Sequence, residues 1–173
     1  MHKIQRAQIV KVTFLILGLI QSLFAIAQEE KKEIQATTAL PDLPSVAHSY
    51  KNFYSNAQFD FAIDPDSIAI QPVEKNEIRY SLKATSKQGA ENISYEGIRC
   101  DKRQKIIYAI ARSDGSWHRA RSPEWSAIIR TGNNLQHTTL ENDYFCTGNA
   151  LSGTIESIRN RIKFNRPLNN NRP

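Results

Sequence analysis

The stretch that decides the fold runs from residue 78 to residue 85 and reads IRYSLKAT. Apolar side chains fall at every second position, and the positions between them are polar. A period of two is typical of a strand with one buried face and one face in water. We therefore predict a β-strand here, in a sheet that buries one side against the rest of the protein.

Further strand patterns lie on both sides of this stretch. The predicted strands cover residues 59–63, 67–70, 92–100 and 104–112, and another starts at Trp117. A proline turn at residues 64–66 and an Asp-Gly turn at residues 114–115 separate neighbouring strands. Short connections between consecutive strands predict an antiparallel meander.

Helical signals follow the sheet. Ser122 can cap a helix and Pro123 suits its first position, so we predict a short helix with Trp125 on its apolar face. Residues 140–146 predict a short helix or turn that brings Cys146 to the sheet, and the helical spacing of Ile155, Ile158 and Ile162 predicts an amphipathic helix after Gly148. The expected fold is α+β: a small antiparallel meander of about five to six strands, short helices and a C-terminal amphipathic helix.

The N-terminus predicts export. Residues 1–27 combine a basic start, an apolar run and an Ala-x-Ala site, which is typical of a signal peptide cleaved between Ala27 and Gln28. An uncleaved membrane anchor is the alternative, although the apolar run is shorter than the roughly 20 residues of a spanning helix. We expect a periplasmic or envelope-associated protein.

Composition divides the remainder of the chain. Residues 28–44 predict a flexible polar linker, residues 45–150 a single domain, and residues 151–173 a basic helix with a disordered tail. A hydrophobic content of 40% in 173 residues allows one core and excludes wholesale disorder. Removing residues 1–27 lowers the formal net charge from +6 to +3. The surplus lies at the C-terminus, where it favours an anionic membrane surface over nucleic acid or is simply a solvated helix face.

The chain has two cysteines, Cys100 and Cys146. An even pair in an exported protein usually forms a structural disulfide, and a reactive thiol is the alternative.

Catalytic and metal-binding patterns are missing from the sequence. His48, His118 and His137 lack the spacing of a metal site, so we expect neither a metal nor a cofactor. Asp114 and Ser116 beside His118 are better explained by turn chemistry than by a catalytic triad. We expect a protein that is not an enzyme and has no catalytic residue.

One group of side chains suggests a binding face. It combines aromatic and basic residues of the sheet and of the segment that follows: Tyr95, Tyr108, Trp117, Trp125, Arg99, Arg112, Arg119 and Arg121. The aromatic residues either pack in the core or line a groove for a glycan or peptide. Within the same sheet, Gly97 predicts a bulge or a close backbone approach, and Glu96 is expected to pair with Arg79 or Arg112.

The chain resembles the cryptic neisserial protein (CNP-one-like) family, small exported bacterial proteins of unknown function. The resemblance covers residues 59–146 and is most specific in the run SYEGIRC at residues 94–100. It implies an envelope location and a disulfide between Cys100 and Cys146, and it implies no catalytic residue. Many relatives look like lipoproteins with a cysteine at the cleavage site, which this sequence lacks.

Together these features predict a non-enzymatic binding or scaffolding protein of the bacterial envelope, with an unknown envelope protein or glycan as its partner. A small glycan- or peptide-binding domain is the alternative, and a cell-wall hydrolase ranks third.

Overall fold

The computed structural model describes residues 41–46, 49–71, 76–132 and 135–168. The predicted signal peptide, its cleavage site at Ala27 and Gln28, residues 28–40 of the predicted linker and His48 lie outside the described residues. The last five positions of the predicted tail do as well.

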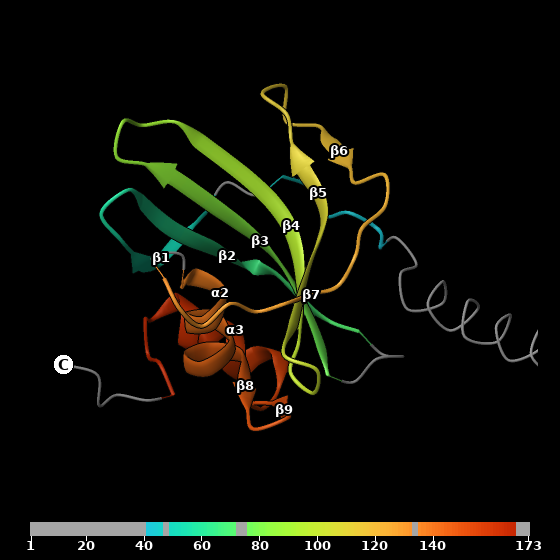
Figure 1. Cartoon of the computed structure of the whole chain (residues 1–173), viewed down its shortest axis with the longest axis vertical. Coiled ribbons are helices and arrows are strands. Elements are labelled where there is room, and N and C mark those ends of the chain that lie inside the picture. The colour runs from blue at the N-terminus through green and yellow to red at the C-terminus, as the bar shows by residue number, and fades with distance from the viewer. Residues whose placement is uncertain (1–40, 47–48, 72–75, 133–134, 169–173) are drawn as a thin grey trace, which may run out of the picture. The chain divides into compact units, whose positions relative to one another are not determined.

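The sheet is an antiparallel meander in which the first six strands follow one another in chain order (Figure 1). They are β1 (Lys51–Ser55), β2 (Phe59–Ile70), β3 (Glu77–Ser86), β4 (Glu91–Arg99), β5 (Gln104–Ala111) and β6 (Trp117–Arg119). A seventh strand, β7 (Ser126–Ala127), pairs with the start of β5. The α+β class and the meander predicted from the sequence are confirmed.

Strand β3 shows why the alternation was informative and where it misled. Ile78, Tyr80 and Leu82 are buried on one face, which we call the helix face because it packs on the helices. The opposite face, here called the outer face, was expected to be wet, but Ser81 is fully buried. The outer face is covered because Leu43, Trp117 and Trp125 pack against its tyrosines. The sheet therefore has a buried layer on both sides.

The turn expected at residues 64–66 lies within β2, where the strand bulges instead of ending. The pairing jumps from Asp64 opposite Ser81 to Ala69 opposite Arg79. Ser67 Oγ donates to the Asp64 carbonyl oxygen at 2.7 Å and accepts from the Ser81 backbone N–H at 2.8 Å, so the extra residues keep hydrogen-bond partners. A serine that replaces missing backbone partners lets β2 continue past the bulge.

The helix expected from Ser122 is absent from residues 122–130, which are extended or irregular except for β7. This prediction was wrong for a tertiary reason. Ser126 and Ala127 pair with Lys105 and Gln104, and the Trp125 ring lies over the Arg99 guanidinium at 4.1 Å. Pairing with the sheet and burial of the indole outweigh the local helix signals.

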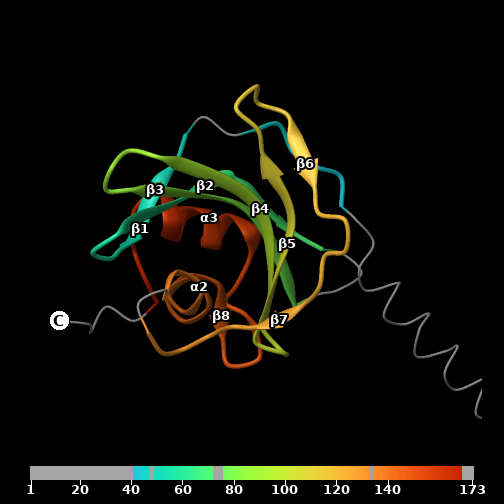
Figure 2. The ribbon, with the colours of Figure 1, turned by 45° about the horizontal axis from the view of Figure 1, so that its top comes forward.

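The helical layer forms from the last third of the chain. It contains α2 (Gln136–Thr139), the π-helix η1 (Leu140–Phe145), the small hairpin of β8 (Cys146–Thr147) and β9 (Ala150–Leu151), and α3 (Ile155–Lys163). Figure 2 shows strands β2 to β5 curving around α2 and α3. Ile158 and Ile162 of α3 are buried in the same core cluster as the helix face of the sheet.

Two of the basic residues of α3 hold it in place. Arg159 donates to the Ile68 carbonyl oxygen at 2.7 Å, and Arg161 donates to the Ser152 carbonyl oxygen at 2.8 Å. Thr154 caps the helix by accepting from the Ser157 backbone N–H at 3.3 Å. Part of the basic character of the C-terminal segment is thus used inside the domain.

Candidate functional site

The four predicted aromatic residues do come together on the outer face. The centroid of the Tyr95 ring lies 6.2 Å from that of the Tyr108 ring and 6.1 Å from that of the Trp117 ring. Tyr95 and Tyr108 are only 4% and 0% exposed, and Trp117 and Trp125 are half-buried. Trp117 Nε1 donates to the Pro44 carbonyl oxygen at 2.7 Å. The rings therefore form a small second core, and little tyrosine surface is left for a ligand.

The four predicted arginines do not form one rim around these rings. Arg99 is buried against Trp125, and Arg119 donates to the Pro41 carbonyl oxygen at 2.8 Å. Arg112 contacts His118 instead, with 2.8 Å between Nη2 and Nδ1, and Arg121 is exposed. Two of the four thus hold neighbouring segments on the outer face.

A buried acid lies beside the outer-face rings. Tyr108 Oη donates to Glu77 Oε1 at 2.7 Å, and Arg79 forms an ion pair with the same carboxylate. Burial and the negative charge of Glu77 raise the pKa of Tyr108 well above its usual range. Arg79 also lies 4.9 Å from the centre of the Tyr108 ring. The predicted pairing of Arg79 with Glu96 is therefore wrong, because the two side chains project from opposite faces of the sheet.

A cavity of about 380 Å³ opens on the helix face, and sequence reasoning did not find it. Its apolar walls come from β2, β3, β5 and the segment after β7: Phe61, Leu82, Ala84, Ile107, Ile110 and Ile129. Its polar residues come from β4, β5 and α2: Asn92, Ser94, Glu96, Lys105, Gln136 and His137. Three of the wall residues, Ile107, Ile110 and Ile129, are 37%, 44% and 67% exposed. Large apolar side chains that face a hollow instead of the core are typical of a binding site.

Glu96 forms the centre of the polar side of this cavity. Its Oε1 accepts from Ser94 Oγ at 2.7 Å, and its Oε2 lies 2.7 Å from His137 Nε2 and accepts from Tyr80 Oη at 3.1 Å. Burial favours the neutral acid, but the His137 charge and the hydrogen bonds from His137 and Ser94 outweigh it and lower the pKa of Glu96. The cavity therefore contains an ionised carboxylate whose two oxygens are already occupied.

His137 replaces the arginines that the sequence suggested as partners of Glu96. The alternation of β4 correctly places Glu96 on the face of Ser94 and Ile98. His137 lies 41 positions later in the chain, on a four-residue helix that no periodic pattern marks. Only the packing of α2 against the sheet brings the two together.

Two other polar groups of the cavity lack partners within the part of the chain that the structure describes. The Gln136 Oε1 atom is buried and accepts no hydrogen bond there. Lys105 is half-buried and forms no ion pair with a described carboxylate. These groups are therefore available to a ligand.

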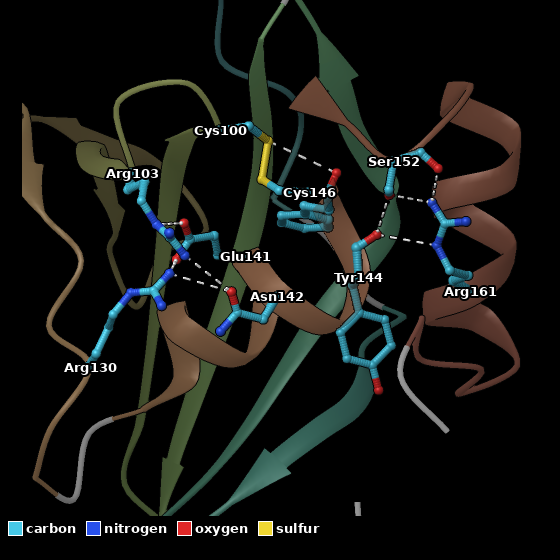
Figure 3. Close-up of a disulfide and its surroundings, with 10 residues drawn as sticks. Cys100, Arg103, Arg130, Glu141, Asn142, Tyr144, Cys146, Ser152 and Arg161 are labelled. Atoms are coloured by element: carbon cyan, nitrogen blue, oxygen red, sulfur yellow. Dashed lines mark hydrogen bonds and ion pairs between the residues drawn. A yellow bond between two sulfur atoms is a disulfide. The ribbon is translucent and has the colours of Figure 1, made fainter. Parts of the chain in front are cut away.

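The two cysteines form a disulfide, as predicted, with their Cα atoms 5.6 Å apart (Figure 3). It joins the end of β4 to β8 and lies beside a second hollow of about 390 Å³. Figure 3 shows Arg103 and Arg130 both reaching the Glu141 carboxylate, at 2.8 and 3.0 Å. Because Glu141 neutralises part of this positive charge and the walls are mostly polar, the hollow on the helix face is the better candidate site.

Metal binding and membrane crossing find no support among the described residues. No group of three or more His, Cys, Asp or Glu side chains there could hold a metal ion. His118 and His137 contact Arg112 and Glu96, respectively. No described helix is long and apolar enough to cross a membrane.

Comparison with known proteins places the chain in a family. The profile of the CNP1-like family matches residues 27–163, which is most of the chain. The chain belongs to the CNP1-like family. Searches of curated proteins and of solved structures found no match. The CNP1-like region includes the whole sheet, both cysteines and α3, so the cavity on the helix face lies within the part that defines the family.

Proposed function

We propose that this CNP1-like protein is an exported, non-enzymatic binding protein of the bacterial envelope, and that its helix-face cavity holds an apolar group of its ligand. The observation that carries the proposal is the exposure of Ile107, Ile110 and Ile129 around one hollow. Each apolar group that a ligand buries there gains roughly 25 cal/mol per Å² of apolar surface removed from water. The volume lies at the lower end of the range for small-molecule sites, about 300–1,000 Å³.

The polar side of the cavity favours binding over catalysis. Ser94 donates to the Glu96 carboxylate and not to His137, so the serine lacks the direct contact with an imidazole that activates the nucleophile in Ser–His hydrolases. Glu96 in turn is ionised, which makes it unsuited to act as a general acid near neutral pH. This arrangement holds the floor of a pocket in a fixed geometry.

Export is supported by two independent features. Residues 1–27 have the pattern of a cleaved signal peptide. The disulfide between Cys100 and Cys146 is of a kind that persists in oxidising compartments.

The test uses a small neutral alkyl compound and methyl-labelled protein. We expect 1-octanol to shift the NMR signals of the Ile107, Ile110 and Ile129 methyl groups and to leave Ile106, which faces the outer side, unchanged. Replacing Ile110 by Ser should weaken this binding, because it removes apolar wall surface. Phe164→Ser is the matched control, since Phe164 is exposed elsewhere. Equal shifts across all isoleucines, or none at the cavity, would contradict the proposal.

The C-terminal end of α3 supports a contact with an anionic membrane surface. Phe164 is 57% exposed, and Lys163 and Arg166 lie 5.9 and 5.6 Å from the centre of its ring. An exposed aromatic side chain with flanking cations suits the interface of an anionic bilayer. We expect sedimentation with phosphatidylglycerol vesicles and not with phosphatidylcholine vesicles, and a reduced bound fraction for Phe164→Ser. Equal binding of both proteins would remove this contact from the proposal.

A further inference from the structure

The charged groups of the helix-face cavity differ in how freely they can bind a ligand. Glu96 already accepts hydrogen bonds from Ser94 and Tyr80 and contacts His137 at 2.7 Å. A ligand cation would have to compete with these groups for the same two oxygens. The acid is therefore a poor anchor for a ligand, although it is the most buried charge in the cavity.

Lys105 is a charged group of the cavity that forms no ion pair with a described carboxylate, although its positive charge contributes to the lowered pKa of Glu96. It lies near the start of β5, two residues before Ile107 and in register with Ile98 of β4. Because Lys105 lines the same cavity as the apolar wall residues, an anion bound beside it would interact with its charge more strongly than at an open surface. Lys105 is already half-buried, so an anion that binds it would displace fewer water molecules from its side chain and would incur a smaller desolvation cost.

Gln136 of α2 also lines the cavity and is a second candidate contact. One end of its side-chain amide is buried without a partner among the described residues. Rotation of the amide by half a turn exchanges its oxygen and nitrogen, so this end can donate as well as accept a hydrogen bond. A carboxylate between Lys105 and Gln136 would satisfy both groups.

We propose that the ligand is a single-chain carboxylic acid, with its carboxylate between Lys105 and Gln136 and its alkyl chain against Ile107, Ile110 and Ile129. This inference rests on the proposed function, because it identifies the polar end of a ligand whose apolar end defines the cavity. A volume of about 380 Å³ suits one short chain and is too small for a two-chain phospholipid.

The experiment compares three probes of equal chain length by isothermal titration calorimetry: octanoate, 1-octanol and octylammonium. We expect octanoate to bind about tenfold more tightly than octanol. Lys105→Met keeps the approximate length of the side chain and removes its charge, so it should abolish the preference of the cavity for octanoate over octanol. Lys102→Met is the matched control, because Lys102 is exposed in the loop before β5.

Each result has a distinct meaning. If octanol binds and octanoate binds no better, the carboxylate inference fails while the proposed function stands. Tighter binding of octylammonium would also overturn the inference, because it would make Glu96 the anchor. If none of the three probes binds, the proposed function fails and the inference falls with it. A preference for octanoate that survives Lys105→Met would show that another group recognises the acid.

Discussion

Gly97 lies at a closely packed point of the outer face. A Cβ atom at this position would lie 3.1 Å from Ile106 Cγ2 and Tyr108 Cε2 and 3.4 Å from Trp125 Cη2. The glycine thus allows the Trp125 ring to lie directly on the backbone of β4. Of the two explanations that the sequence left open for Gly97, the close approach is observed at Gly97 itself, and the β4–β5 pairing shifts its register just before it, between Tyr95 and Glu96.

We expect Gly97→Ala to lower the free energy of unfolding by about 1–3 kcal/mol, since the neighbouring rings would have to move. Urea denaturation followed by tryptophan fluorescence would measure the change. Asn92→Ala, on the same strand but exposed, is the control and should stay within about 0.5 kcal/mol of the wild type. An equal effect of both substitutions would mean that β4 tolerates alanine poorly for another reason.

The lowered pKa of Glu96 predicts that the fold loses stability in acid. Its pKa is lowered in the folded protein, so it contributes stability above the ordinary glutamate pKa of about 4.3, and this stability is lost as the pH falls through the lower folded value. Glu96→Gln cannot lose a charge and should show a smaller drop in Tm between pH 6 and pH 3. It should also be less stable than the wild type at pH 6 by about 1–3 kcal/mol. The glutamine NH2 group replaces one carboxylate oxygen and would face a hydrogen-bond donor instead of accepting from it.

Exposed Glu124→Gln is the matched control for this measurement and should follow the wild-type profile. If Glu96→Gln kept the wild-type acid dependence, the buried pair with His137 would not be its source.

At the level of elements, the disulfide ties the helical layer to the sheet. It closes a loop with a sequence separation of 46, which spans β5, β6, β7, α2 and η1. A disulfide that closes a loop of this length lowers the conformational entropy of the unfolded chain, which stabilises the fold by about 4 kcal/mol. We expect reduction to lower the free energy of unfolding by that amount, as measured by urea denaturation with and without reductant.

The control for reduction is the double variant Cys100→Ala and Cys146→Ala, which should be as unstable without reductant as with it. A wild-type midpoint that did not move on reduction would mean that core packing alone fixes the helical layer.

The elements that the sequence predicted share one property: their pattern repeats within the element itself. Strands β3, β4 and β5 follow from alternation, and α3 follows from the spacing of Ile155, Ile158 and Ile162. The helix expected at Ser122 failed because its local signals compete with pairing to β5, which no local pattern encodes. The cavity was missed for a similar reason, since its walls come from four strands and two later segments.

At the scale of the whole molecule, we expect export to leave a chain that begins at Gln28. Intact mass measurement and N-terminal sequencing of protein purified from the envelope fraction would test this. Ala27→Phe should block cleavage, because the peptidase requires a small residue at that position. Mature protein that retained residues 1–27 would favour the membrane-anchor alternative.

The segment at residues 41–44 determines how the domain can be presented in an experiment. The carbonyl oxygens of Pro41 and Pro44 accept hydrogen bonds from Arg119 and Trp117 on the outer face, whereas the cavity opens on the helix face. Leu168, near the other end, donates its backbone N–H to the Asp143 carbonyl oxygen on the helical side. A biosensor surface that captures the domain just before residue 41 would therefore be attached on the side of the outer face and would leave the cavity open to the solution. Capture through the C-terminus would attach the domain on the side of the helices.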